Sequence, residues 1–176
     1  MTHVAHECSS ETRMEFVATR EKPYHFADCG LPNIYLVGVT QFRCECGNEL
    51  VEIPALKQLM SLIARQVVLK NEALTGDEVR FLRKQLGQRA ADFAEKVKLQ
   101  PETLSRMETG KQRIGERTDN YIRIYYAFAS KDTVLVDSAK EAIDLILAEK
   151  RKRVKRRAKT FARIDHHQEW ALEAAA

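Results

Sequence analysis

Cysteine and basic side chains are the groups in this sequence whose spacing suggests chemistry. The four cysteines, Cys8, Cys29, Cys44 and Cys46, all lie within the first 46 residues. Thiolates are good zinc ligands, and cysteines of a cytoplasmic protein are better explained by metal binding or by reduced thiols than by disulfides. Towards the C-terminus, seven of the eight residues 150–157 are Lys or Arg. Such a run suits contact with phosphate or another polyanion.

Enzyme signatures are missing from the sequence. It contains no G-x-S-x-G nucleophile elbow, Walker loop, H-E-x-x-H metal motif or dinucleotide-binding fingerprint. His166 and His167 stand in a polar stretch, and we interpret them as solvated side chains rather than as catalytic groups. We therefore expect a protein that is not an enzyme.

Composition and charge indicate a globular protein whose residues 1–54 are acidic and whose residues 55–176 are basic. Of its 176 residues, 44% are hydrophobic and 31% are charged, which allows a sizeable core. No stretch approaches the length of a membrane span or of a signal-peptide core, so we expect a cytoplasmic protein with no membrane contact. Residues 1–54 hold four Lys or Arg against eight Asp or Glu, whereas residues 55–130 hold fourteen against nine and residues 131–176 hold eleven against eight. This distribution favours a phosphate-bearing partner for the later residues, with an ordinary solvated surface as the alternative.

Residues 1–54 are predicted to form a small β-rich domain. Apolar residues fall in short runs at 16–19, 34–39 and 50–53, and turn-forming residues separate them. A unit of this size has few residues for a core. It usually needs a staple or a partner surface.

Residues 55–74 are predicted to be a connector helix. Pro54 suits a first helical position. One face has apolar residues at i, i+3, i+4 and i+7 spacing, namely Leu56, Leu59, Met60, Ile63 and Val67. We expect this helix to end near residues 70–71 and to pack on one domain or to bridge both.

Residues 75–130 are predicted to be entirely helical, with three short and closely spaced helices first. Thr75 can cap the first helix, and Glu78 three residues later completes a capping box. The second helix is expected over residues 89–97, and Pro101 begins the third. Helices this short cannot each bury much surface, but together they can present one helix to a groove.

Two glycines are predicted to stop helices in this region. Gly87 ends the first helix, and Gly110 ends the third in the left-handed conformation. A fourth helix is expected over about residues 117–129. The side chains predicted to face inward are Val79, Leu82, Leu86, Phe93, Ala94, Val97, Leu104 and Met107, and the apolar residues of the fourth helix are Tyr121, Ile122, Ile124 and Tyr125.

Residues 131–176 are predicted to form a C-terminal basic helix and a tail. A helix that begins at Asp137 carries an apolar face of Ala142, Ile143, Ile146 and Leu147 and continues into the basic run. That run can lie along a DNA backbone, or it can be a solvated helix end. Residues 171–176 are expected to be frayed.

Residues 75–129 resemble the Xre-type (Cro-like, lambda-repressor-like) helix-turn-helix domain. The resemblance rests on LRKQLG at 82–87, on the alanine within DFAEKV at 92–97, and on LSRMETGK at 104–111, spaced without a gap. In that family the third helix lies in the major groove of DNA. The resemblance therefore implies that Gln100, Glu102, Thr103 and Arg106 face base edges. Arg106 can contact a guanine, and Glu102 can accept from a cytosine or can merely complement the helix dipole.

The same resemblance implies roles for charged residues around the third helix. Arg89, Lys111 and Arg113 are expected to contact phosphates, although each can equally be a solvated surface charge. Arg83 and Glu108 match a partly buried salt bridge between the first and third helices. The sequence departs from the family at two positions, because Ala90 stands where a backbone-contacting glutamine is frequent and Lys98 where a glycine is frequent.

A longer stretch, about residues 24–130, resembles the MqsA-type (YgiT-type) antitoxin family. The segments that carry the likeness are YHFADCGLPNIYLVGVTQFRCECGNELVEIPALKQL and LTGDEVRFLRKQLG. Proteins of that family join an N-terminal zinc-binding domain to a C-terminal Xre-type helix-turn-helix. The resemblance implies an antitoxin that binds a toxin encoded next door and represses its own operon.

The cysteine pattern departs from that family, which typically has two CxxC pairs. Here Cys8 stands alone near His6, the second pair is contracted to Cys44-Glu45-Cys46, and Cys29 occupies a position that is generally not a ligand. A structural zinc ion can still be held by Cys8, Cys44 and Cys46 with either His6 or Cys29 as the fourth ligand. The alternative is a degenerate finger whose thiols are simply buried.

Together these features predict an α+β protein that binds double-stranded operator DNA as a homodimer and regulates transcription, as the antitoxin and autorepressor of a type II toxin-antitoxin operon. The alternatives are a protein-interaction module that works through residues 1–54, with DNA binding secondary, and a stand-alone Xre-type regulator without a toxin. The salt dependence of DNA binding distinguishes the regulator from the protein-interaction module. Phosphate contacts release counterions, so the DNA affinity of a regulator falls as salt rises, whereas a protein-only binder shows no DNA shift.

Overall fold

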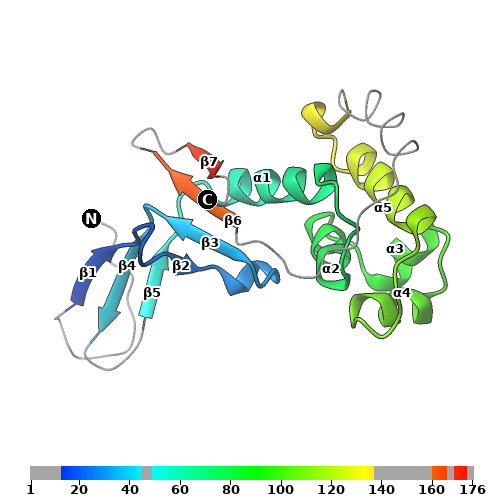
Figure 1. The fold of residues 1–176 in the computed structure, drawn as a ribbon, viewed down its shortest axis with the longest axis horizontal. Helices are drawn as coiled ribbons and strands as arrows, with labels where there is room; N and C mark the ends of the chain where they lie inside the picture. Colours follow the sequence, from blue (N-terminus) through cyan, green and yellow to red (C-terminus); the bar gives the residue numbers. More distant parts are fainter. Residues whose placement is uncertain (1–12, 45–48, 137–159, 166–168, 174–176) are drawn as a thin grey trace.

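The computed structural model describes residues 13–44, 49–136, 160–165 and 169–173. In these residues the chain forms two β-sheets at one end and a group of helices at the other (Figure 1). The predicted α+β class is therefore confirmed. No helix in these ranges is long and apolar enough to cross a membrane.

The first sheet has three antiparallel strands in the order β1-β4-β5. They are β1 (Arg13–Val17), β4 (Thr40–Cys44) and β5 (Glu49–Glu52). The apolar runs expected at 16–19 and 50–53 each overlap one of these strands. The run at 34–39 is followed directly by β4. Gly38, with φ of 86°, lies in the turn between Val37 and Thr40, the first residue of β4.

The second sheet has four strands in the order β2-β3-β6-β7. They are β2 (Tyr24–His25), β3 (Ile34–Val37), β6 (Thr160–Ile164) and β7 (Trp170–Glu173), with the short 3-10 helix η1 (Ala27–Cys29) between β2 and β3. Strand β6 runs parallel to β3, and the other two pairs are antiparallel. Two strands that are far apart in the sequence thus form the centre of this sheet.

The C-terminal segment corrects the prediction of a helix followed by a tail. Residues 160–164 and 170–173 are strands, and the indole Nε1 of Trp170 donates a hydrogen bond to the Pro54 carbonyl at 2.8 Å. The backbone of residues 160–163 pairs with β3, which lies more than a hundred positions earlier in the sequence. A pairing between such distant segments cannot be predicted from the local sequence pattern. The part predicted to be a basic helix (137–157), His166-His167 and residues 174–176 lie outside the described residues.

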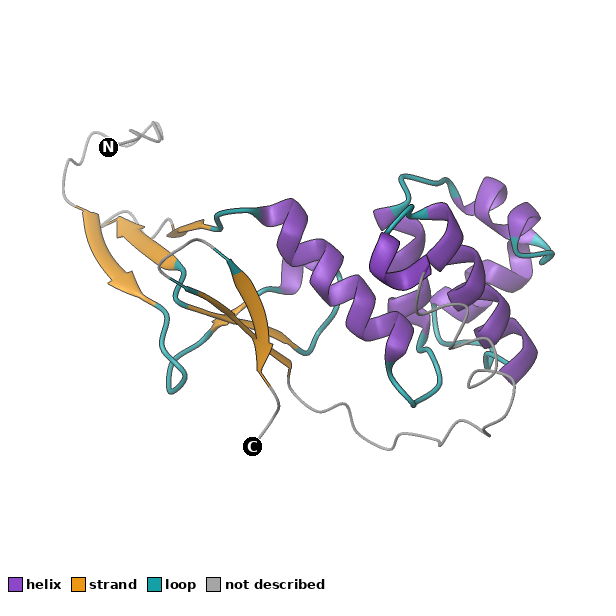
Figure 2. Ribbon diagram, turned by 90° about the horizontal axis from the view of Figure 1, so that it is seen from above, coloured by secondary structure: helices purple, strands orange, loops and turns teal. Residues whose placement is uncertain are grey.

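The helices are α1 (Leu56–Leu69), α2 (Gly76–Gln85), α3 (Ala90–Lys96), α4 (Pro101–Glu108) and α5 (Glu116–Ala129). Figure 2 shows α1 lying between the sheets and the remaining helices. The four helices predicted within 75–130 correspond to α2, α3, α4 and α5, whose bounds are close to those expected. Residues 133–136 are also helical.

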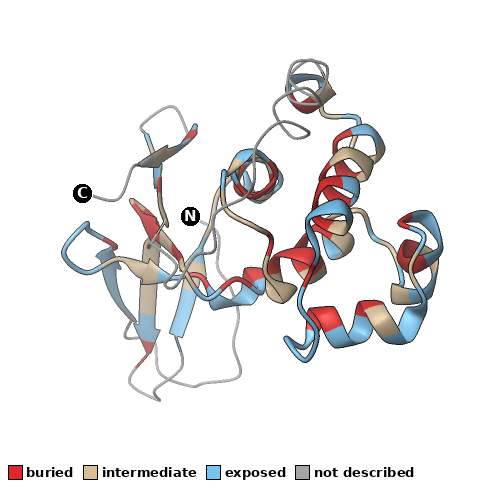
Figure 3. Ribbon diagram, turned by 45° about the vertical axis from the view of Figure 1, so that its right-hand side comes forward, coloured by how far each residue is buried: buried red, intermediate tan, exposed pale blue. Residues whose placement is uncertain are grey.

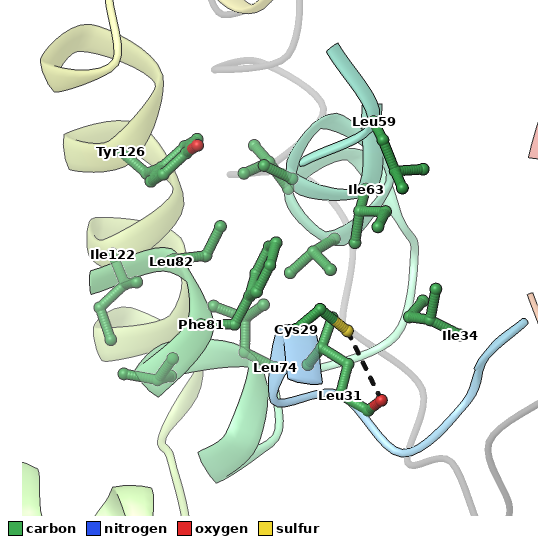
Figure 4. Packing of buried hydrophobic residues seen from close by; sticks show 14 of the residues in the cluster. Cys29, Leu31, Ile34, Leu59, Ile63, Leu74, Phe81, Leu82, Ile122 and Tyr126 are labelled. Carbon is green, nitrogen blue, oxygen red and sulfur yellow. Dashed lines mark hydrogen bonds between the residues drawn. The ribbon is translucent and has the colours of Figure 1, made fainter. Parts of the chain in front are cut away.

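One continuous hydrophobic core joins the sheets to the helices. Cys29, Leu31 and Ile34 pack beside Leu59 and Ile63 of α1 (Figure 4), and the same cluster extends to Phe81, Leu82, Ile122 and Tyr126 of α2 and α5. In Figure 3 buried residues, coloured red, occur both on the strands and on the helices. Helix α1 therefore connects the β-sheets to the remaining helices. Of the two arrangements expected for this helix, the structure shows the one in which it bridges both parts.

The start of α1 differs from the prediction. Ala55 adopts a left-handed φ of 48° and is the N-cap, so the helix begins at Leu56 and leaves Pro54 outside. The Pro54 carbonyl is used instead by Trp170. Leu56 is consequently exposed, whereas Leu59, Ile63 and Val67 of the predicted face are buried together with Ala64 and Val68, which were not predicted.

The predicted capping of α2 is confirmed. The Thr75 side chain accepts from the Glu78 amide, and the Glu78 carboxylate accepts from the Thr75 amide at 2.7 Å. Gly87 and Gly110 have φ of 64° and 73°, as expected for left-handed stops after α2 and α4. Leu86 is half-buried, and the remaining side chains predicted to face inward in α2, α3 and α4 are buried.

Helix α5 buries a charged residue that the sequence pattern did not indicate. Arg123 is fully buried, whereas Tyr121 is 43% exposed and is not a core residue. The guanidinium donates to the Asp119 carboxylate on its own helix at 2.9 Å, to the carbonyls of Val67 and Val68 in the last turn of α1, and to those of Lys70 and Glu72 just after it. A buried arginine is tolerated because hydrogen bonds of this kind compensate the loss of solvent.

Candidate nucleic-acid interface

Helix α4 rests on two other short helices that hold it at the surface. It packs against α2 and α3. Its inward residues Leu104 and Met107 are buried, because they recur on the side that meets those helices. Pro101 at the start and Gly110 after the end limit α4 to two turns. The sequence thus fixes both the length and the buried side of this helix.

The salt bridge expected between Arg83 and Glu108 is present. Nε and Nη2 of Arg83 donate to the two carboxylate oxygens of Glu108 at 2.7 and 2.9 Å, and both side chains are largely buried. The hydrogen bonds to Glu108 raise the pKa of Arg83 above its ordinary value. Arg83 also donates to the Gln88 carbonyl at 3.0 Å, just before α3. One guanidinium therefore joins α2, the α3 entry and α4.

Gly76 allows α2 to approach α4 closely. A Cβ atom at this position would lie 2.2 Å from the Met107 carbonyl oxygen and 3.0 Å from that of Glu108. Any side chain would push the two helices apart. Glycine at the first residue of α2 is therefore needed for packing, a role that the capping pattern around it did not reveal.

The turn between α3 and α4 contains a non-glycine residue in the left-handed region. Lys98 has φ of 56°, at the position where the resembling family frequently has glycine. A β-carbon in this conformation costs about 1 kcal/mol. The backbone turn is kept in spite of this cost, with the Leu99 amide bonded to the Ala94 carbonyl at 2.8 Å.

The residues predicted to face bases lie at the start and on the outer side of α4. Gln100 is the N-cap, and Gln100, Glu102 and Arg106 are exposed, whereas Thr103 is half-buried. Glu102 and Arg106 are four residues apart and share one face of the helix. The outer face therefore combines an acceptor near the N-terminus with a guanidinium one turn later.

The residues predicted to contact phosphates flank α4. Lys111 and Arg113 are exposed in the loop that follows the helix. Arg89 is the N-cap residue of α3, and its guanidinium is bonded to the Asp92 carboxylate at 2.8 and 3.1 Å on the surface. This pair lowers the pKa of Asp92 and raises that of Arg89. A phosphate at Arg89 would have to share the guanidinium with Asp92.

Four further exposed residues border this surface and were not predicted. Ser105 and Thr109 lie on the outer face of α4, and the Thr109 hydroxyl donates to the Ser105 carbonyl at 2.8 Å. Lys96 and Lys98 are exposed at the end of α3 and in the turn. Helical spacing from Glu102 and Arg106 would have identified the first two, since positions i+3 and i+7 share a face.

The two described cysteines lie in different parts of the molecule. Cys29 is buried in the core, and its thiol donates to the Phe26 carbonyl at 3.0 Å. Burial raises the pKa of this thiol, so the thiolate that a zinc ligand requires is disfavoured there. In the described structure Cys29 is thus a buried core thiol.

Cys44 has a different setting from Cys29. It is buried at the end of β4, opposite Arg13, the first residue of β1. The chain segments that contain Cys46 and Cys8 join the three-stranded sheet at this same end, although both residues and His6 lie outside the described ranges. Among the residues that the structure describes, no group of three or more His, Cys, Asp or Glu side chains is arranged to hold a metal ion.

Comparison of the chain with protein-family models, with curated proteins and with solved structures finds no match.

Proposed function

We propose that this protein is a sequence-specific transcriptional regulator that binds double-stranded operator DNA through α4. The observation that carries the proposal is the outer face of α4, where Gln100, Glu102 and Arg106 are exposed while the inner face is locked to α2 by Arg83 and Glu108. A short rigid helix of this kind can enter a major groove without reorganising. In this proposal α3, its turn and α4 form a helix-turn-helix.

Each side chain has a distinct part in the proposed complex. Arg106 donates to guanine O6 and N7, a contact that discriminates bases by about 1–3 kcal/mol. Gln100, Glu102 and Thr103 contact neighbouring base edges. Lys111, Arg113 and Arg89 neutralise phosphates and so set affinity rather than sequence preference. Because DNA half-sites are related by a two-fold axis, we expect a homodimer.

The biological role that we propose is that of an antitoxin which represses its own operon and binds the toxin encoded beside it. This part of the proposal comes from the likeness of residues 24–130 to the MqsA-type family. A stand-alone regulator with the same DNA-binding surface is the alternative. Footprinting of the DNA upstream of the gene, with and without the neighbouring gene product, distinguishes the two, because only an antitoxin changes its footprint when that product is added.

A second candidate function is a protein-interaction module centred on residues 1–54. The observation that favours it is the exposure of large apolar side chains on both faces of the three-stranded sheet, Met14 and Phe16 on one face and Val17 and Leu50 on the other. Exposed apolar clusters commonly mark protein contacts. Phe16→Glu should then abolish co-purification with the neighbouring product and leave DNA binding unchanged. If the protein shows no DNA mobility shift even at low salt, this second candidate replaces the first.

We also propose that the protein holds a structural zinc ion with Cys8, Cys44, Cys46 and His6, without Cys29. The proposal rests on the position of Cys44 at the end of the sheet to which the other segments connect. Metal analysis of the purified protein should give zinc that Cys44→Ser removes and Cys29→Ser retains. Equal loss from both variants would contradict this ligand set.

A further inference from the structure

The four-stranded sheet has two faces with different chemistry. On one face, Leu36 and its cross-strand partner Ala162 are fully buried in the core. On the other face, His25, Tyr35 and Phe161 are cross-strand partners on the adjacent strands β2, β3 and β6. His25 is exposed, and Tyr35 and Phe161 are half-buried, so the second face carries a row of solvent-accessible rings.

The three rings form a continuous aromatic row. The centroids of His25 and Tyr35 are 4.9 Å apart with an angle of 23° between the planes, and those of Tyr35 and Phe161 are 5.8 Å apart at 33°. Nε2 of His25 lies 3.0 Å from the Pro32 carbonyl, which fixes the orientation of the imidazole. Strands β3 and β6 are the two central strands of the sheet, and each contributes one ring.

Cationic side chains border this aromatic row. The Arg20 guanidinium lies 5.8 Å from the centroid of Phe161. Arg163 is two residues after Phe161 on β6, hence on the same face, and both arginines are exposed. Glu173 is the cross-strand partner of Phe161 on the edge strand β7 and is the acidic residue on this register row. The central part of the face is therefore aromatic and basic.

From this arrangement we propose that the aromatic row, with Arg20 and Arg163, binds single-stranded nucleic acid. Bases stack on aromatic rings, and arginines contact the phosphates that link them. A four-stranded sheet with an aromatic residue on each of its two central strands, backed by helix on its opposite face, is suited to holding two or three nucleotides in this way. The proposal goes beyond duplex recognition by α4, since it uses a different surface and a different form of nucleic acid.

Cross-strand aromatic pairs also stabilise a sheet, so the experiment must separate binding from folding. The informative variants keep the sheet packed. Tyr35→Leu retains an apolar side chain but removes a stacking ring. Arg163→Gln removes a phosphate-binding charge at an exposed site. Lys57→Gln, on the exposed side of α1, is the charge-matched control.

The test measures fluorescence anisotropy of labelled twelve-nucleotide oligothymidine and oligouridine with the full chain at low and at physiological salt. Binding of both probes is expected, with an affinity that falls as salt rises. Tyr35→Leu should raise Kd at least about fivefold, and Arg163→Gln should raise it and reduce the salt dependence, while Lys57→Gln changes neither.

Several outcomes would overturn the proposal. It is wrong if neither probe binds at low salt, or if folded Tyr35→Leu and Arg163→Gln proteins bind as the unaltered chain does. It is also wrong if Arg106→Ala abolishes binding of the single strands, because the probes would then occupy α4. Circular dichroism and thermal melting establish that each variant is folded, and Arg163→Gln decides the matter if Tyr35→Leu does not fold. Loss of duplex binding alone, with single-strand binding kept, would reject the α4 proposal but not this one.

Discussion

Arg83 and Glu108 form a two-point hydrogen-bonded pair that fastens α4 to α2, with Arg80 donating to the Glu108 carbonyl at 2.9 Å beside it. Planar guanidinium and carboxylate groups that meet in this way fix orientation as well as distance. The outer face of α4 therefore has a defined direction, and the predictions that follow depend on it.

Removal of the Glu108 carboxylate should destabilise the helical part strongly. Glu108→Ala leaves Arg83 largely buried without its partner, which typically costs about 3–5 kcal/mol. Urea unfolding monitored by circular dichroism measures the change. Glu95→Ala, on the exposed side of α3, is the control and should change stability by less than about 0.5 kcal/mol. Equal effects from the two variants would show that the pair does not hold α4.

Gly76→Ala should loosen the contact between α2 and α4. Its Cβ would lie 2.2 Å from the Met107 carbonyl oxygen, and relief of such overlap costs about 1–3 kcal/mol. Gly115→Ala is the matched control, because nothing lies within 4 Å of a Cβ there. Thermal melting should show a lower Tm for the first variant and little change for the second. A melting temperature unchanged in both would contradict the close approach of the two helices.

The sequence predicted the local features of this region better than the long-range ones. The capping box at Thr75 and the stops at Gly87 and Gly110 depend on neighbouring residues, and these predictions were confirmed. The parallel pairing of β3 with residues 160–164 depends on contacts across most of the chain. No residue type in that segment distinguishes a strand from a tail without its partner.

Burial of charge was the second feature that the sequence did not reveal. Tyr121 is among the apolar residues named from the sequence for the helix at 117–129, and Arg123 was not singled out, whereas the structure exposes Tyr121 and buries Arg123. The reason is the end of α1, whose free carbonyls need donors that an apolar side chain cannot supply. For the proposed interface, the sequence indicated which residues of α4 face outward, but not the pairing of Arg89 with Asp92.

Arg123→Met should separate α1 from α5. The substitution leaves the buried Asp119 carboxylate without its cationic partner and removes the donor to the carbonyls of Val67, Lys70 and Glu72. The expected loss is about 3–5 kcal/mol of the free energy of unfolding. Arg117→Met, exposed on the same helix, is the control. If Arg123→Met lowers the free energy of unfolding only slightly, the packing of α1 against α5 does not depend on the hydrogen bonds of Arg123.

Tyr126 should make the protein sensitive to alkali. Burial of its ring, and secondarily the charge of Asp132, raise its pKa to about 12. Because the folded pKa is above the unfolded value, this residue contributes stability below pH 10, and the contribution is lost as pH rises towards 12. Tyr126→Phe should therefore unfold at higher pH than the unaltered chain in a fluorescence titration, with Tyr121→Phe as the control for loss of a hydroxyl. If Tyr126→Phe and the unaltered chain unfold at the same pH, the burial of this phenol is not what limits alkaline stability.

The most direct measurement of the central claim compares Arg106→Ala with Lys111→Ala on operator DNA and on operators changed at single base pairs. If α4 reads bases, Arg106→Ala loses preference at one position by a factor of about 5 to 160, whereas Lys111→Ala weakens binding to all sequences alike and reduces the salt dependence. If both folded variants give the same footprint and the same base preferences as the unaltered chain, α4 is not the DNA-reading helix.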